Sequence, residues 1–286
     1  MAKLTLALDA SQINTFMECP SMWYFQYRMN LEPVFWSHEA LSKGTIVHGL
    51  LERYYKFRAA INSVEDSCKM AIENFQVDKA KLEVDEETYK FLITRFAQYC
   101  ANYSRSDYKP LKVGKKPLIE TGFSVPLVDN ASELFVLEGR IDLMVELSNV
   151  GPAFMDHKTQ SRTNELYGKS TQFRTYAMVT NSSHGVINYF GLQKTVNEKT
   201  FRRTLLHFSA EERQWWKQEL IKKFYEVAYA VRSGYFEHRW SSCLGKYGYP
   251  CQFTKICETR SEHLKNAIIQ VEYKQRPEWL PWEEGE

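Results

Sequence analysis

The 286-residue sequence lacks an excess of either charge: 37 lysine and arginine residues balance 35 aspartate and glutamate residues, and the formal net charge is +2. Such a balance gives no overall signature of nucleic-acid binding, so any basic surface must be local. The chain also lacks a run of about 18 apolar residues, so we expect no transmembrane helix and no membrane partner. The stretch from Met1 to Asp9 is too short and too soon acidic for a signal peptide, which predicts a cytoplasmic protein.

Internal repeats and low-complexity tracts are missing as well, and no linker separates two independent units. Apolar residues make up 44% and charged residues 25% of the sequence, which excludes a disordered or collagen-like chain. The length is ample for a substantial core. We therefore predict a single domain over residues 1–286.

Helical spacing of apolar residues dominates the first part of the chain, residues 1–110. Ser11 is expected to cap a helix that continues to Tyr24. Further helices are expected at residues 39–60, 64–76 and 85–105.

The pattern changes to period-2 alternation in residues 111–233, which predicts strands. A helix is expected at residues 164–180, and Ser209 with Glu212 forms a capping-box pattern that opens a long helix to about residue 232. The expected strands cover residues 119–127, 135–147, 153–158, 184–192 and 201–208. With residues 234–286 as a loop-dominated, cysteine-bearing cap, this order predicts an α/β fold with a mixed sheet.

The strongest local signal for chemistry lies on two expected strands, which carry Gly139-Arg-Ile-Asp142 and Met155-Asp-His-Lys158. A short turn joins them, so we expect a hairpin that brings Asp142 close to Asp156, with Asp156 and Lys158 on one face. Two carboxylates beside a lysine suit a hard divalent cation such as Mg²⁺ or Mn²⁺, and the lysine can orient or deprotonate a water. The alternative is an ordinary, solvated Asp–Lys ion pair.

Three more polar residues belong to helices around this hairpin. His48 lies on an early helix, and Gln172 and Tyr176 lie four residues apart on one helix face. Gln172 and Tyr176 are spaced to touch a phosphate, the lysine or a bound water. Each of the three also has a structural interpretation, because lone helical histidines and polar helix edges are common.

The order and spacing of the motifs resemble the RecB-like branch of the PD-(D/E)XK nucleases, which includes Cas4 exonucleases and the nuclease domains of AddB helicase-nucleases. The motifs are Gly-Thr-x-x-His at 44–48, Gly-Arg-Ile-Asp at 139–142, Asp-His-Lys at 156–158 and Gln-x-x-x-Tyr at 172–176. The opening stretch from Ser11, with Cys19-Pro20 and the aromatic run after it, is also similar. The resemblance covers about residues 9–257 and implies a restriction-endonuclease-like core with a helical N-terminal part and a cysteine-rich C-terminal cap. No helicase is implied, because the chain lacks a Gly-x-x-x-x-Gly-Lys-Ser/Thr phosphate loop.

The resemblance implies roles for residues of this chain. The residues implied to bind a Mg²⁺ or Mn²⁺ ion are His48, Asp142, Asp156 and, on the strand before the Asp142 strand, Glu120. The residues implied to take part in catalysis are Lys158, as the catalytic lysine, with Asp142, Asp156, Gln172 and Tyr176.

Six cysteines complete the set of informative residues, and a disulfide framework is not expected in a large cytoplasmic chain. Cys68 and Cys100 lie in apolar helical settings and are expected to be buried free thiols. The other four are spaced poorly for a zinc finger and leave a metal site, a cluster or free thiols open. The resembled nucleases hold a [4Fe–4S] cluster with one early and three late cysteines, which implies that role for Cys19, Cys243, Cys251 and Cys257.

The resemblance implies a metal-dependent DNA nuclease, an exonuclease that processes DNA ends in recombination or repair, either phage-type or Cas4-like. A recombination or CRISPR-adaptation protein is the expected partner besides DNA. Two alternatives stay open: a non-catalytic DNA-binding or assembly protein that keeps the fold and the cluster, and a zinc-stapled RNA-processing factor. The candidates for contact with the phosphate backbone are Arg53, Arg140, Lys169, Arg174, Arg202 and Arg203.

Overall fold

The computed structural model of the protein describes residues 3–34, 39–76, 84–160, 165–245, 250–276 and 280–281. The chain forms two compact units, each assembled from separate segments. Unit 1 consists of Met1–Trp36, Phe123–Gly139 and Trp215–Glu286, and unit 2 consists of Ser37–Gly122 and Arg140–Gln214. Within the described ranges, no helix has the length and apolar character needed to cross a membrane.

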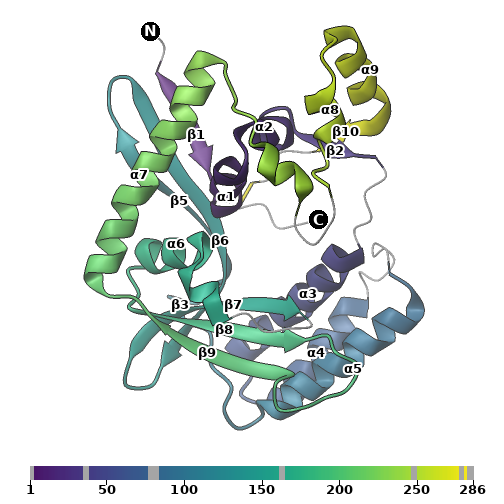
Figure 1. Ribbon diagram of the computed structural model, residues 1–286. Coiled ribbons are helices and arrows are strands. Elements are labelled where there is room, and N and C mark those ends of the chain that lie inside the picture. The colour runs from purple at the N-terminus through teal and green to yellow at the C-terminus, as the bar shows by residue number, and fades with distance from the viewer. Residues whose placement is uncertain are drawn as a thin grey trace. The chain divides into compact units, whose positions relative to one another are not determined.

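Unit 2 contains the helices expected in the first half of the chain. They are α3 (Glu39–Ala60), α4 (Val64–Gln76) and α5 (Glu86–Asn102), as Figure 1 shows, and they confirm the predictions for residues 39–60, 64–76 and 85–105. The side chain of Asp85 caps α5 by accepting a hydrogen bond from the backbone N–H of Thr88 at 2.7 Å. The three helices and one face of the sheet share a buried apolar core that includes Leu50, Tyr54, Ala71, Phe96, Val145 and Phe190.

The sheet of unit 2 has the order β6-β7-β8-β9, with β6 entering from unit 1. Its strands are β6 (Glu133–Leu147), β7 (Gly151–Gln160), β8 (His184–Gly191) and β9 (Phe201–His207). The β6–β7 pair is the expected hairpin, β7 and β8 are parallel, and β8 and β9 are antiparallel. The sheet is therefore mixed, and the predicted α/β class is confirmed.

A helical crossover joins the parallel strands β7 and β8, as parallel pairing requires. It contains a 3-10 turn (Glu165–Lys169) and α6 (Thr171–Val179), whose first turn is capped by Ser170. The prediction of one helix over residues 164–180 is correct in place but misses the break at the cap, and residue 164 lies outside the described residues. A small ribbon of β3 (Lys112–Val113) and β4 (Lys116–Pro117) completes unit 2.

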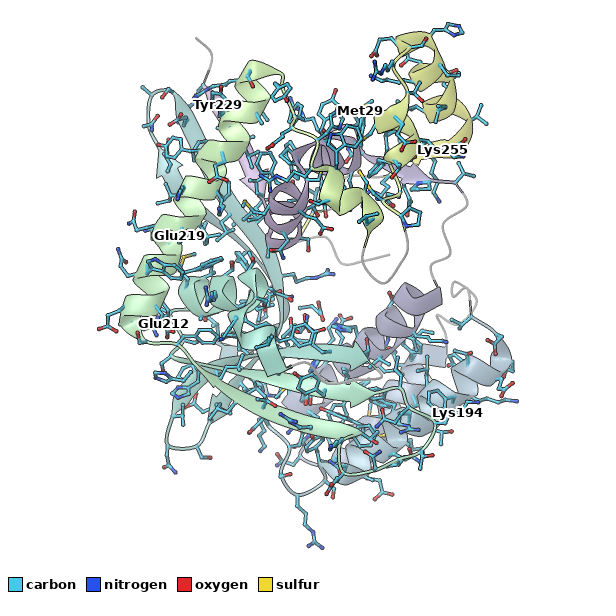
Figure 2. The ribbon with its side chains drawn as sticks, in the orientation of Figure 1. Met29, Lys194, Glu212, Glu219, Tyr229 and Lys255 are labelled. Atoms are coloured by element: carbon cyan, nitrogen blue, oxygen red, sulfur yellow. The ribbon has the colours of Figure 1, made fainter. Side chains whose placement is uncertain are left out.

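Besides β6, two further long elements have residues in both units. β5 (Ile119–Asp129) pairs with β6, and α7 (Ala210–Ser233) begins in unit 2 and ends in unit 1. The predicted capping box of α7 is confirmed, because the N–H of Ser209 donates to Glu212 at 2.8 Å and the N–H of Glu212 donates to the Ser209 hydroxyl at 3.1 Å. Figure 2 shows Glu212 at this end of the helix.

Unit 1 opens with a strand that the sequence pattern did not predict. β1 (Leu4–Leu8) pairs in parallel with the first half of β6, with Leu4 opposite Glu133. α1 (Ala10–Glu18) follows, and its cap is Asp9 rather than the predicted Ser11, since the side chain of Asp9 accepts from the N–H of Gln12 at 2.8 Å.

The predicted helix to Tyr24 is also wrong in its continuity. α1 ends at Cys19 in extended conformation, Pro20 begins the short α2 (Pro20–Trp23), and a π-helical turn follows at Tyr24–Arg28. Proline has no N–H to continue the helix before it, but it suits the first turn of a new one.

The C-terminal part is more regular than predicted. It contains a 3-10 turn (Trp240–Leu244), α8 (Thr254–Glu258), α9 (Glu262–Glu272) and β10 (Tyr273–Gln275), which pairs with β2 (Leu31–Pro33). The tail therefore packs on the N-terminal segment through a small apolar cluster of Leu31, Phe253, Ile256 and Tyr273. α9 itself contains no glycine, proline, phenylalanine, tyrosine or tryptophan, so the prediction of a loop-dominated cap was wrong for this segment.

Candidate active site

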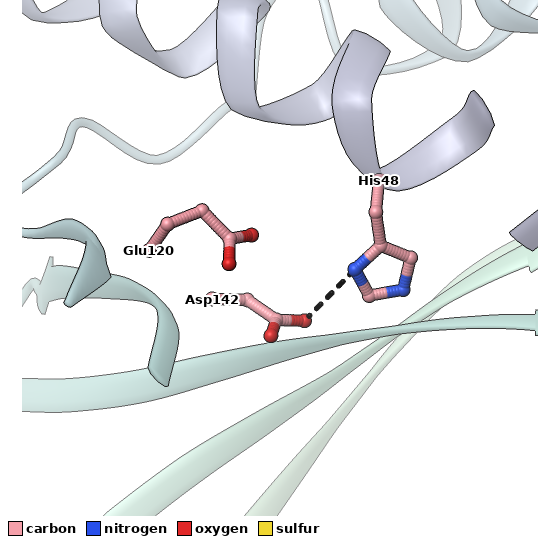
Figure 3. Close-up of side chains that lie close together, drawn as sticks. All are labelled: His48, Glu120 and Asp142. Carbon is pink, nitrogen blue, oxygen red and sulfur yellow. Dashed lines mark ion pairs between the residues drawn. The ribbon is translucent and has the colours of Figure 1, made fainter. Parts of the chain in front are cut away.

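Three side chains that could bind a metal ion converge in unit 2 from distant parts of the chain. His48 projects from α3, Glu120 from the start of β5 and Asp142 from β6, as Figure 3 shows. One donor atom of each residue lies within 4.8 Å of the other two, and Nδ1 of His48 lies 3.6 Å from Oδ2 of Asp142. One imidazole nitrogen and two carboxylate oxygens form a donor set that suits a divalent cation.

Asp142 stays ionised although it is buried. The backbone N–H of His157, on the paired strand β7, donates to Oδ2 of Asp142 at 2.8 Å. Burial acts to raise the pKa of Asp142, but the neighbouring His48, His157 and Lys158, together with this hydrogen bond, hold it below its usual value. The carboxylate is therefore available to a cation at neutral pH.

Glu120 lies near this carboxylate and has an unusual backbone conformation. Its φ angle is 45°, in the left-handed region that residues other than glycine seldom adopt. Burial, and next the charge of Asp142, raises the pKa of Glu120 to about 8, although Arg140 lies 3.1 Å from its Oε2. A divalent cation shared by Glu120 and Asp142 would relieve their repulsion, so these residues fit a metal ion.

The raised pKa of Glu120 predicts how the metal-free protein responds to pH. The folded state keeps the Glu120 proton up to about pH 8, whereas the unfolded state loses it near pH 4.5, so the free energy of unfolding should fall as the pH rises between these values. The contribution is roughly 3 to 5 kcal/mol at about 1.4 kcal/mol per pKa unit. Chemical unfolding of the metal-free protein at pH 5 and pH 8 should show a smaller decrease in a Glu120→Gln variant. An equal decrease in both proteins would contradict the argument, and Glu87→Gln, at an exposed carboxylate of α5, is the control.

Asp156, Lys158 and Gln172 form a closed ring of polar contacts beside the metal-binding group. Nζ of Lys158 lies 2.7 Å from Oδ2 of Asp156 and donates to Oε1 of Gln172 at 2.8 Å. Nε2 of Gln172 donates in turn to Oδ1 of Asp156 at 2.9 Å. Each of the three groups is thereby fixed in orientation by the other two.

The charges around Lys158 determine its protonation state. Burial raises the pKa of Asp156 to about 6, with a further increase from Asp142. Burial also acts to lower the pKa of Lys158, but the carboxylates of Asp156 and Asp142 outweigh it, and the pKa lies above its usual value. Lys158 is therefore an ammonium at neutral pH, suited to orienting a water or stabilising negative charge rather than to removing a proton.

Tyr176 holds α6 against β6. Its buried hydroxyl donates to the backbone carbonyl of Arg140 at 2.6 Å and accepts from Nε2 of Gln172 at 2.9 Å. Tyr176 thus orients the side chain of Gln172. It also links α6 to β6 at Arg140, two residues before Asp142.

The predicted metal ligands therefore fall into two adjacent sets. His48, Glu120 and Asp142 share one space, whereas both oxygens of Asp156 face Lys158 and Gln172. The two sets are close enough for Asp142 to raise the pKa of Asp156.

The predicted phosphate contacts include one clear error. The Arg203 guanidinium is buried, with Nη2 2.6 Å from Oδ1 of Asp107, so it cannot reach a substrate. Arg140 pairs with Glu120, and Arg53 packs over the ring of Phe75 at 5.0 Å. Lys169, at the end of the 3-10 turn, is exposed.

The four cysteines of the predicted cluster all belong to unit 1 and influence one another. Burial raises the pKa of the Cys257 thiol to about 12, with further increases from the thiols of Cys251, Cys19 and Cys243. The N–H of Cys251 donates to the carbonyl of Cys243 at 3.0 Å.

The backbone around Cys19 is tied directly to the tail. Ser21 donates from its N–H to the carbonyl of Glu237 at 3.1 Å, and the Ser242 hydroxyl donates to the carbonyl of Glu18 at 2.8 Å. The early and late cysteines thus lie in segments that contact each other. Cys68 and Cys100 are buried and free, as predicted.

His157 is a site neighbour that the sequence analysis missed. Strand alternation places its side chain on the opposite face of β7 from Asp156 and Lys158, and its Nδ1 lies 2.8 Å from Nδ2 of the buried Asn188. Its backbone N–H donates a hydrogen bond to Oδ2 of Asp142 at 2.8 Å. A histidine and an asparagine on otherwise apolar strand faces were the available signal.

Comparisons with known proteins place this geometry in a class. A family model of the PD-(D/E)XK nuclease superfamily matches residues 7–258, and the chain belongs to this superfamily. No curated protein matches the chain. Among solved structures, the crystal structure of SSO0001 aligns over 91% of this chain and 90% of that chain, with 11% identity and a TM-score of 0.39.

Proposed function

We propose that the protein is a metal-dependent nuclease that hydrolyses phosphodiester bonds in DNA. The observation that carries the proposal is the meeting of His48, Glu120 and Asp142 beside the Asp156–Lys158–Gln172 ring in a chain of the PD-(D/E)XK superfamily. Clusters of buried and half-buried charges of this kind are typical of functional sites.

Each group has a separate task in this proposal. His48, Glu120, Asp142 and Asp156 would hold a Mg²⁺ or Mn²⁺ ion, which would supply charge neutralisation and water activation. The imidazole among the ligands favours Mn²⁺ over Mg²⁺. The Lys158 ammonium stabilises negative charge that develops on the phosphate, and Gln172, oriented by Tyr176, keeps that ammonium in place.

We further propose an exonuclease that processes DNA ends in recombination or repair, of phage or Cas4-like type, in the cytoplasm. The four cysteines of unit 1 are proposed to hold a [4Fe–4S] cluster. Burial, and next the neighbouring cysteines, raise the pKa of the Cys243, Cys251 and Cys257 thiols, so assembly of a cluster has to displace their protons. A DNA-recombination or CRISPR-adaptation protein is the proposed partner.

A time course on end-labelled DNA, with the 5′ end and the 3′ end blocked in turn, tests the proposal. Cleavage should require Mn²⁺ or Mg²⁺, stop with EDTA and resume when the ion is restored. An exonuclease should release labelled mononucleotides from an open end and spare DNA with both ends blocked. Tight DNA binding without cleavage under any metal would favour the non-catalytic assembly protein instead.

A further inference from the structure

A network of hydrogen-bonded, buried polar side chains lies next to the candidate site. It starts at the buried carboxylate of Asp107, which accepts hydrogen bonds from Tyr54 at 2.6 Å, from Tyr55 at 3.1 Å and from Arg203 at 2.6 Å. These donors come from α3 and β9, so the network ties a helix to the far strand of the unit 2 sheet. Polar networks of this kind are costly to bury unless every member is paired, and they then fix one arrangement.

Asn188 of β8 connects this network to β7. Its Oδ1 accepts from Nε of Arg203 and from the hydroxyl of Tyr99, each at 3.2 Å. Its Nδ2 is therefore the atom that faces Nδ1 of His157, at 2.8 Å, and it donates there. An amide nitrogen can only donate, so Nδ1 of His157 is the acceptor of this hydrogen bond.

His157 contacts both sides of the metal-binding group. Its N–H donates to Asp142 at 2.8 Å. Its ring stacks on Tyr55 with centroids 5.7 Å apart and planes at 5°, and it meets the ring of His48 edge-on at 5.8 Å. His48 and Tyr55 lie two turns apart on α3 and so project from the same face of that helix. The position of the His157 ring therefore fixes the spacing between α3 and β7.

We propose that Asn188 and His157 are positioning residues, which fix the separation of His48 and Asp142 for a divalent cation. This inference rests on the proposed function. Groups that hold metal ligands from behind commonly change metal affinity by about 10- to 100-fold when they are removed. Neither residue touches the cation or the substrate in this proposal.

The test compares Mn²⁺ binding by the full-length protein and its variants, measured from the electron paramagnetic resonance signal of free Mn²⁺. His48→Ala identifies the part of the binding that belongs to this site. Asn188→Leu should bind that Mn²⁺ about 10- to 100-fold more weakly than the parent. Tyr54→Phe is the matched control: it removes a hydroxyl from the other end of the network, so it should lower the melting temperature but keep the Mn²⁺ Kd within about twofold.

A double variant separates positioning from stability. Asn188→Leu combined with His157→Phe replaces both partners of one hydrogen bond with apolar groups, so β7 keeps no unpaired imidazole. Its melting temperature should recover toward that of the parent, while its Mn²⁺ Kd stays at least about tenfold weaker. Should Asn188→Leu alone fail to fold, the double variant decides in the same way.

The outcomes distinguish the two proposals. A parent protein with no His48-dependent Mn²⁺ binding overturns the proposed function and this inference together. A parent that binds Mn²⁺ and cleaves DNA, with Asn188→Leu or the double variant within about twofold of its Kd, overturns this inference alone and leaves the nuclease standing.

Discussion

Replacing Lys158 with alanine is expected to slow DNA cleavage by roughly 10³-fold. The substitution removes the ammonium that lies 2.7 Å from Asp156 and 2.8 Å from Gln172, so charge developing on the phosphate loses its nearest cationic neighbour in the described site. It also leaves the buried Asp156 without the positive charge that holds its pKa down to about 6. The rate is best measured in single-turnover experiments with saturating Mn²⁺.

Metal binding separates the role of Lys158 from that of the carboxylates. Lys158→Ala should keep its Mn²⁺ Kd within about threefold of the parent, because the loss of a repelling cation beside the site offsets the higher pKa of Asp156. Asp156→Asn should lower the cleavage rate by a similar factor and also weaken Mn²⁺ binding. Lys194→Ala, at an exposed lysine of unit 2 labelled in Figure 2, is the control. Unchanged cleavage in both site variants would reject the site assignment.

Cys257→Ser is expected to give a colourless protein that has lost most of its iron. A serine hydroxyl does not replace a thiolate as a cluster ligand, and the remaining thiols Cys19, Cys243 and Cys251 hold a [4Fe–4S] cluster less firmly. Because ligand binding to a folded site adds to folding stability, the melting temperature should fall by roughly 10 °C or more. Visible absorption, iron analysis and thermal unfolding of anaerobically purified protein give the three readings.

The location of the cysteines sharpens this prediction. They belong to unit 1 and the candidate active site belongs to unit 2, so the Mn²⁺ Kd of Cys257→Ser should stay within about threefold of the parent value even where cleavage falls. Cys68→Ser, at a buried thiol of unit 2, should keep the colour and the iron. A parent protein that is colourless and carries zinc would refute the cluster and favour a zinc staple.

The fold could be predicted where its elements are long and their pattern is regular. The helices at 39–60 and 64–76 and the hairpin of β6 and β7 follow directly from periodicity. β1 was missed because five residues with alternating leucines are too short to stand out from the helix after them, and only pairing with β6 makes them a strand. The cap at Asp9 was missed for a similar reason, since Ser11 is as good a capping residue in isolation.

The candidate site could be predicted in part. The alternation of strand residues places Asp156 and Lys158 together, and the i, i+4 spacing places Gln172 and Tyr176 together. The left-handed backbone at Glu120, the burial of Arg203 and the contact of His157 with Asn188 left no such pattern. Each depends on residues that are distant in sequence.

By itself, the sequence determined the mixed α/β class, the residues able to bind a cation and the lysine beside them, because periodicity and residue chemistry act locally. Tertiary structure alone decided which candidate ligands share one space, that burial does not remove the charge of Lys158, and that His157 is held by a network reaching Asp107. The physical reason is that burial and the distance between charges set pKa values and orientations, and both arise only when α3, β6, β7 and α6 pack together.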